Sequence, residues 1–210
     1  MMGNGLTMAA ELVLAHKDDA SGEGGAAREY AEDLILAYSV EQAARNAREG
    51  SGAVPVKVQF AFDDKREVYA LDGVVKAFGV RMCFNDGVGT VTLIGYQTDI
   101  DAAGVMWDLI APQLATEMAA PRCKTLGFAQ TYGETVRNRL ELRIRELPQY
   151  DAAVWAARKA AVEQAFRRLA GRVRSRSASF DVRGMAAGAR ADLGGRRGRV
   201  NASPVGALAA

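Results

Sequence analysis

The sequence predicts a helix-dominated α+β fold, in which a small antiparallel three-stranded sheet is packed by helices and an arginine-rich helical region follows at the C-terminal end. Three observations predict it. Aromatic residues make up only 7% of the 210 residues while alanine and glycine are abundant, which favours closely packed helices. Long stretches repeat apolar residues at intervals of three and four. Between residues 56 and 96 this spacing gives way to short β-branched runs bounded by turn residues.

Residues 1–49 are predicted to form an N-terminal helical region. Apolar side chains three and four residues apart predict one amphipathic helix around 6–13 and a second over 27–38. The glycine-rich stretch 21–25 between them predicts a break in the helix.

A third short helix is predicted to begin at Ser39 and to run to about Glu49. Ser39 is followed three residues later by Gln42, and at a helix start each of these side chains could satisfy the backbone N–H of the other. Residues 50–55 then combine flexible residues with Pro55, which cannot donate a backbone hydrogen bond. We therefore place a linker there.

A central α+β domain is predicted over residues 56–148. Large apolar residues alternate with other residues over 56–62, which puts the large groups on one face of a strand. Helical spacing returns over 67–79.

A β-hairpin is predicted next in this domain. The apolar and β-branched runs 80–84 and 88–96 flank Asn85-Asp86-Gly87, a sequence that tolerates the left-handed backbone of a tight turn. The two runs are therefore predicted to pair in antiparallel fashion.

Two longer helices complete the central domain. Thr98 could cap the first, and Asp99 and Asp101 in its first turn would interact favourably with the positive end of the helix dipole. Pro112 predicts a kink in this helix. The second helix, over 129–147, ends at a proline.

The C-terminal helical basic region, residues 149–193, precedes a tail, residues 194–210. Apolar spacing predicts a helix over 154–169 that a glycine ends. A second, short helix is predicted to approach a neighbour closely through its small residues, which are Gly184, Ala187, Gly188 and Ala191.

The small net charge of +2 hides an asymmetry. Residues 151–210 hold eleven arginines and one lysine against four acidic residues, so their net charge is 12 − 4 = +8. The first 150 residues must then carry 2 − 8 = −6. The chain thus combines an acidic body with a basic C-terminal end.

Three sequence blocks resemble a known family. Residues 31–41, AEDLILAYSVE, resemble the helix signature of domain-of-unknown-function family 2786. Residues 77–81 together with 91–100 are similar to its companion C-terminal domain, domain-of-unknown-function family 7168. Residues 186–194 resemble the glycine-alanine block that ends many actinobacterial members.

This resemblance implies an actinobacterial or phage source. It brings no established reaction, cofactor or substrate to named residues. Two positions depart from the family pattern, because Tyr30 stands where the family usually has lysine and Ile35 stands where it usually has methionine. A role that requires the lysine charge is not expected here.

The sequence predicts no catalytic residue, no metal ligand and no cofactor site. Cys83 and Cys123 form no CxxC pair, and the single histidine, His16, cannot supply two imidazoles to a metal. No phosphate-binding loop of the GxGxxG or GxxxxGK[ST] type is present. The acidic residues that could best bind a divalent cation are Asp99, Asp101 and Asp108. They do not all lie on one face of the predicted helix.

The arginines of the C-terminal end give the clearest indication of function in this sequence. They are Arg167, Arg168, Arg172, Arg174, Arg176, Arg183, Arg190, Arg196, Arg197 and Arg199. They could dock on an acidic protein surface of the same or a neighbouring chain, or neutralise phosphates and bind nucleic acid.

We favour a non-enzymatic interaction or assembly protein that docks on an acidic protein surface. A nucleic-acid-associated accessory protein is the alternative, and an enzyme with an unrecognised site is the third.

The expected location and partners follow from the composition. The first fifteen residues have no cationic region ahead of their apolar residues, and no window approaches the roughly 18 apolar residues of a membrane span. We expect a cytoplasmic protein, in the host cytoplasm or virion if a phage encodes it. Its expected partners are a protein or a second copy, with nucleic acid as the alternative, and not a membrane.

Overall fold

The structure is a computed structural model, and it describes residues 4–16, 22–50, 52–170 and 178–193. This part of the chain forms seven α-helices, one 3-10 helix and a three-stranded antiparallel sheet. The predicted fold class, a helix-dominated α+β fold with a small sheet, is confirmed.

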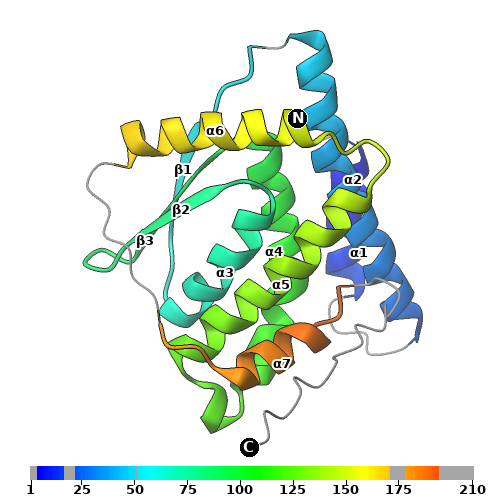
Figure 1. Ribbon diagram of the computed structural model, residues 1–210. Coiled ribbons are helices and arrows are strands. Elements are labelled where there is room, and N and C mark those ends of the chain that lie inside the picture. The colour runs from blue at the N-terminus through cyan, green and yellow to red at the C-terminus, as the bar shows by residue number, and fades with distance from the viewer. Residues whose placement is uncertain (1–3, 17–21, 51, 171–177, 194–210) are drawn as a thin grey trace, which may run out of the picture.

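The N-terminal region consists of two helices, α1 (Asn4–His16) and α2 (Gly22–Glu49), which pack against each other and against α4 (Figure 1). The predicted third helix is wrong, because α2 continues through Ser39 without interruption. Ser39 is fully buried, and its hydroxyl donates a hydrogen bond of 3.0 Å to Asp99 Oδ1 on α4. This tertiary contact takes the place of the predicted local cap. The predicted break over 21–25 is also wrong for residues 22–25, because α2 begins at Gly22, and residue 21 lies outside the described residues.

The sheet is built from β1 (Val56–Ala61), β2 (Arg81–Asn85) and β3 (Thr90–Gly95), in the order β1-β3-β2. β3 is antiparallel to both neighbours, so the predicted hairpin of β2 and β3 is confirmed. α3 (Lys65–Ala77) connects β1 to β2, which therefore run parallel with β3 between them. This is a split βαβ arrangement.

The turn between β2 and β3 is longer than predicted. The glycine with a left-handed backbone is Gly89, whose φ is +60°, and not Gly87. Asn85 Oδ1 instead accepts a hydrogen bond of 3.0 Å from the backbone N–H of Gly87. The carbonyl of Gly89 accepts one of 2.8 Å from Phe62, so the turn is also tied to the end of β1.

The two faces of the sheet pack against different layers. The face that carries Val91 and Leu93 joins the main core with α3 and α4. The opposite face carries Ile94 and the half-buried Cys83, which pack against Phe166 of α6 (Ala152–Leu169) in a small second core. Figure 1 shows α6 lying across this face of the sheet.

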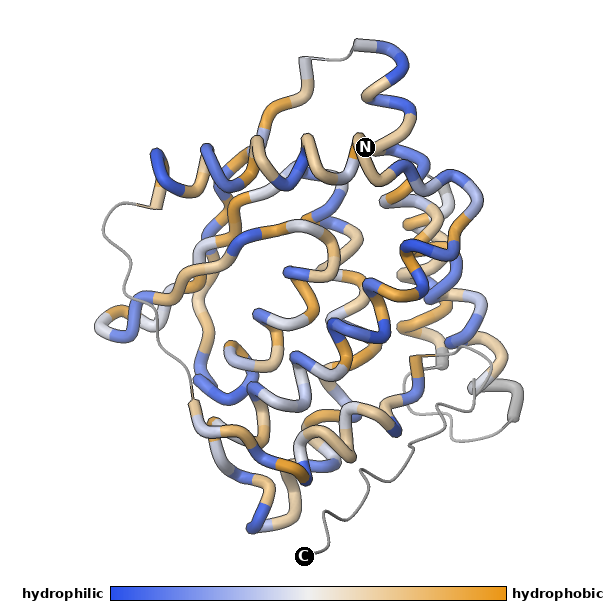
Figure 2. The backbone as a smooth tube through the Cα atoms, in the orientation of Figure 1, coloured by the Kyte–Doolittle hydropathy of each residue, from blue (hydrophilic) through white to orange (hydrophobic). Residues whose placement is uncertain are grey.

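The remaining elements are α4 (Gln97–Met118), η1 (Pro121–Cys123), α5 (Leu126–Glu146) and α7 (Val182–Arg190). The predicted cap of α4 by Thr98 is wrong: the helix begins after Tyr96, and the buried Thr98 hydroxyl has no hydrogen-bond partner. α4 continues through Pro112, and α5 ends before Pro148 as predicted. Figure 2 shows hydrophobic and hydrophilic residues alternating along α5 and α6, as expected of helices with one buried face.

One core joins these elements. The main cluster of buried apolar residues extends from Leu6 in α1 to Leu193 beyond α7, and so includes all three regions expected from the sequence. α3 and α5 approach most closely where Gly73 faces Gly133, because a Cβ added at Gly73 would lie 2.1 Å from the carbonyl oxygen of Gly133. α7 packs on α5 as well, whereas α6 packs on the sheet and on α2.

Candidate functional site

The structure describes four of the ten arginines that the sequence singles out. Arg167 and Arg168 lie on α6, and Arg183 and Arg190 lie on α7. Figure 1 shows α6 and α7 on opposite sides of α5, so these four do not gather in one cluster. The other six lie outside the described residues; they are Arg172, Arg174, Arg176, Arg196, Arg197 and Arg199.

Three of the four described arginines pair with carboxylates of the same chain. Arg167 Nε lies 3.4 Å from Glu163, and Arg183 lies 2.7 Å from Asp181, so both pairs are local. Arg190 lies 3.2 Å from Glu117 on α4 and thus reaches from the basic end to the body. Each pair is exposed and is worth at most about 1 kcal/mol.

Small residues hold α7 against α5. A Cβ added at Gly184 would lie 2.3 Å from the carbonyl oxygen of Phe128, and one at Gly188 would lie 2.7 Å from that of Tyr132. Gly127 at the start of α5 would meet Ser179 in the same way, at 2.3 Å. The short small-residue helix and its close approach to a neighbour are therefore confirmed.

Side chains of the body anchor residues 178–193, which we call the C-terminal segment. Arg139 on α5 donates to the carbonyls of Gly188, at 2.9 Å, and Ala191, at 2.6 Å. Gln113 on α4 donates to the carbonyl of Asp192 and accepts from its backbone N–H, at 2.8 and 2.6 Å. Carbonyls at a helix C-terminus need such partners, and cations suit the negative end of the helix dipole. Within the described residues, arginine, glutamine and threonine side chains that bond to its backbone thus hold the segment more than acidic residues of the body do.

A buried carboxyl supports these anchors from α2. Glu32 is fully buried, and Arg143 on α5 lies 2.5 Å from it and also contacts Asp33 and the carbonyl of Leu193. Burial raises the pKa of Glu32, although Arg143 and Arg139 oppose the shift. The cluster ties α2, α5 and the C-terminal segment together.

Three large apolar side chains of the C-terminal segment point outward, whereas Leu193 at its end is buried in the main core. Phe180 is 69% exposed, Val182 61% and Met185 43%, whereas the residues that α7 buries are Gly184, Ala187 and Gly188. A surface helix normally buries its large apolar residues. We call these three exposed residues the outward apolar face. Exposed apolar surface of this kind is typical of interaction sites.

A second buried network lies near the start of α4. Asp99 is 3% exposed and accepts hydrogen bonds of 2.6 Å from Arg158 on α6 and 3.0 Å from Ser39 on α2. The Arg158 guanidinium also lies 3.8 Å from the centre of the Tyr96 ring. Burial raises the pKa of Asp99 to about 6, against the opposing influence of Arg158 and Ser39. Helix capping explained Asp99 from the sequence alone, which held no signal for Arg158.

No metal centre is formed within the described part of the chain, where no group of three His, Cys, Asp or Glu side chains could hold an ion. The two cysteines are free and half-buried. His16 is the last residue of α1.

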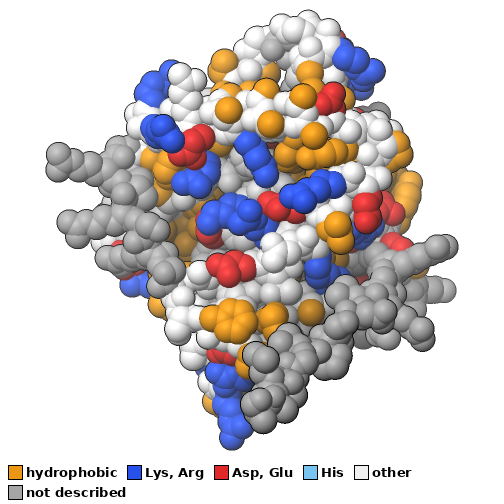
Figure 3. All heavy atoms as spheres, in the orientation of Figure 1, with side chains coloured by type: hydrophobic (Ala, Val, Ile, Leu, Met, Phe, Trp, Pro, Cys, Tyr) orange, Lys and Arg blue, Asp and Glu red, His pale blue; other side chains and the backbone are white. Residues whose placement is uncertain are grey.

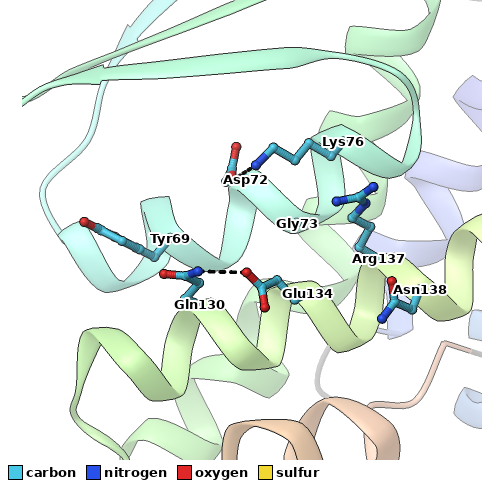
Figure 4. A pocket seen from close by; sticks show the side chains of 8 residues that line it. All are labelled: Tyr69, Asp72, Gly73, Lys76, Gln130, Glu134, Arg137 and Asn138. Carbon is cyan, nitrogen blue, oxygen red and sulfur yellow. Dashed lines mark hydrogen bonds and ion pairs between the residues drawn. The ribbon is translucent and has the colours of Figure 1, made fainter. Parts of the chain in front are cut away.

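A polar hollow of about 210 Å³ lies between α3 and α5, over the crossing of Gly73 and Gly133 (Figure 4). Lys76, Arg137 and Asn138 line one end, and Tyr69, Gln130 and Glu134 line the other. Several of these groups already pair within the hollow: Lys76 binds Asp72, and Gln130 donates to Glu134 at 2.7 Å. The arrangement is a polar recess and holds no nucleophile with a neighbouring base.

Comparison with models of known families, with curated proteins and with solved structures found no match. Among the described residues, no helix has the length and apolar character needed to cross a membrane.

Proposed function

We propose that this chain is a non-enzymatic interaction protein, and that its C-terminal segment docks on an acidic protein partner through the outward apolar face. One observation carries the proposal: α7 uses glycine and alanine to pack against α5, and leaves Val182 and Met185 in solvent beside Phe180, which precedes the helix. Burying these side chains in a complex would release about 1.5–3 kcal/mol for each one that becomes fully covered. The body anchors the segment, so little order would have to be gained on binding.

Charge supports an acidic partner. The exposed Arg122 and Lys124 precede α5, whose Gly127 contacts Ser179, while Arg183 beside the outward apolar face is paired with Asp181. In the sequence, three further arginines lie within residues 171–177, directly before the segment. Two copies of this surface facing each other would bring like charges together, whereas an acidic partner would be attracted.

The proposal is tested by capturing partners with matched surface variants. One variant carries Phe180→Ser, Val182→Ser and Met185→Ser. The control carries Leu14→Ser, Val88→Ser and Leu142→Ser, at apolar residues that are 65%, 69% and 57% exposed elsewhere on the surface. Proteins cross-linked to each chain in a lysate of the source organism are measured by quantitative mass spectrometry at low and high salt.

We expect an acidic protein that the unsubstituted chain and the control retain and that the outward-face variant loses. Its recovery should fall as the salt concentration rises, because salt screens the attraction between the acidic partner and the cations around the outward apolar face. Equal recovery by all three chains would refute a role for the outward apolar face.

A further inference from the structure

Cations outnumber carboxylates on the face formed by α3, β2, α5 and α6. Figure 3 shows Lys and Arg side chains gathered in a band across the middle of the molecule, between α6 and α5. We call this surface the cationic face, and its residues are Lys76, Arg81, Arg137, Arg145, Lys159 and Arg167.

Glu141 lies at the centre of the cationic face and is shared by three cations. Its carboxylate is 2.9 Å from Arg137, 3.5 Å from Arg145 and 3.9 Å from Lys159. The Glu141 side chain is only 15% exposed, against 37%, 60% and 44% for the three cations. A ligand that approaches from solvent therefore meets the cations before it meets the carboxylate.

Glu163 repeats the arrangement on α6, because Arg81 and Arg167 each lie 3.4 Å from it. Lys76 pairs with Asp72, one turn before it on α3. Six cations thus share three carboxylates, which leaves 6 − 3 = +3 on the cationic face. Counting Glu134 at the far end of the adjoining hollow reduces the excess to 3 − 1 = +2.

The hydrogen-bond donors of this face suit phosphate oxygens. Arg137 pairs with Glu141 through Nε, so its two terminal nitrogens remain able to donate. Lys76 and Asn138 line the same end of the hollow, where Figure 4 shows the Arg137 side chain rising from α5 toward α3 and the Lys76 ammonium directed along α3 to Asp72. Guanidinium, ammonium and amide groups are the usual partners of phosphate.

We propose that the cationic face binds the phosphate backbone of nucleic acid. The recognition is electrostatic and independent of base sequence, since the groups concerned are donors and cations on one surface. Five of the six cations are absent from the arginines that the sequence singled out, and only Arg167 belongs to both sets. The proposal does not rest on the protein partner of the C-terminal segment, because it uses other residues.

Three variants of equal charge change test the site. The face variant carries Arg137→Gln, Arg145→Gln and Lys159→Gln, which removes three charges while leaving groups that can still bond to Glu141. The control carries Arg45→Gln, Arg48→Gln and Lys65→Gln, at exposed positions on α2 and at the start of α3. A tail variant carries Arg196→Gln, Arg197→Gln and Arg199→Gln. Binding of labelled DNA is measured at several salt concentrations. Single strands and duplexes of about 20 nucleotides are used, because one single-strand-binding fold covers at most roughly 16 nucleotides.

We expect the unsubstituted chain and the control to bind with affinities within about twofold of each other, and the face variant to bind at least about tenfold more weakly. A plot of log affinity against log salt concentration should have a shallower slope for the face variant. For each phosphate that the variant no longer neutralises, the magnitude of the slope should fall by about 0.7 for a single strand and by about 0.9 for a duplex. Thermal unfolding confirms that all variants are folded. If the unsubstituted chain does not bind at low salt, or if only the tail variant loses binding, the proposal is wrong.

Discussion

Single charged residues join elements that are far apart in the sequence. Asp99 and Arg158 are separated by 59 positions, yet their ion pair fastens α6 to the start of α4 and, through Ser39, to α2. Because both charged groups are buried, their mutual attraction has to offset two desolvation costs. Removing one partner is therefore expected to lower the free energy of unfolding by more than the intact pair adds to it, because the other charge is left buried without a partner.

Replacing Arg158 with methionine is predicted to lower the free energy of unfolding by about 3–5 kcal/mol at pH 8, because it leaves Asp99 buried without its cation. The pKa of Asp99 should rise above its present value of about 6 in the variant, since Arg158 holds it down. Between the unfolded-state pKa of about 4 and the higher folded-state pKa, the Asp99 carboxyl holds a proton in the folded protein that it has lost in the unfolded chain. The free energy of unfolding therefore falls as pH rises between these two pKa values. The cost of the substitution should therefore shrink toward pH 5.

Urea unfolding across this pH range measures the effect. Lys159→Met is the control, because Lys159 is the next residue, is half-exposed and lies 3.9 Å from its partner. Its cost should stay below about 1 kcal/mol with little dependence on pH. A cost for Arg158→Met that grows as pH falls would contradict the account of Asp99.

Two helix pairs in this fold meet where a glycine faces the backbone of the neighbouring helix. Gly73 and Gly133 bring α3 and α5 into backbone contact, and Gly184 and Gly188 do the same for α7 and α5. Backbone on both sides of such a contact cannot move away as the end of a long side chain can. The spacing between these helices is therefore fixed by the absence of Cβ atoms.

Gly73→Ala is predicted to destabilise the protein by more than about 3 kcal/mol, because its Cβ would lie 2.1 Å from a backbone oxygen and would force α3 and α5 apart. Gly104→Ala on α4 is the matched control, since a Cβ there meets nothing within 4 Å. Alanine is the better helix former, so Gly104→Ala should stabilise by about 0.5–1 kcal/mol. Opposite signs in thermal unfolding support this account, and equal effects would contradict it.

The molecule as a whole has its C-terminal segment fastened across the body. Arg139 bonds two carbonyls at the end of α7 and lies in the cluster that includes Glu32 of α2. The segment that presents the outward apolar face is therefore positioned by residues from both earlier regions of the chain.

Arg139→Met is predicted to speed amide hydrogen exchange in α7 by at least about tenfold, because it removes two hydrogen bonds from a charged donor, each worth about 1.5–3 kcal/mol. Exchange in β3 should change far less. Arg137→Met on the same helix is the control, since Arg137 pairs with Glu141 and not with α7. Equal acceleration in α7 by both variants would show that Arg139 does not anchor the segment.

The sequence by itself determined the periodicities and hence the elements. Alternation over 56–62 marked β1, two apolar runs marked the hairpin, and small residues at Gly184, Ala187 and Gly188 marked a closely packed helix. Each of these signals is local, because a helix or strand repeats its faces within a few residues. The helix-dominated fold class followed from them.

Only the tertiary structure decided which polar residues act together. Ser39 fitted a helix cap and Asp99 a dipole contact, yet both turn inward to one network because α2, α4 and α6 meet there. The cations around Glu141 come from α5 and α6, and spacing within one helix carries no information about the other. Pairing between distant charges depends on how helices cross, and such crossings are set by contacts between residues far apart in the sequence, such as that of Gly73 on α3 with Gly133 on α5.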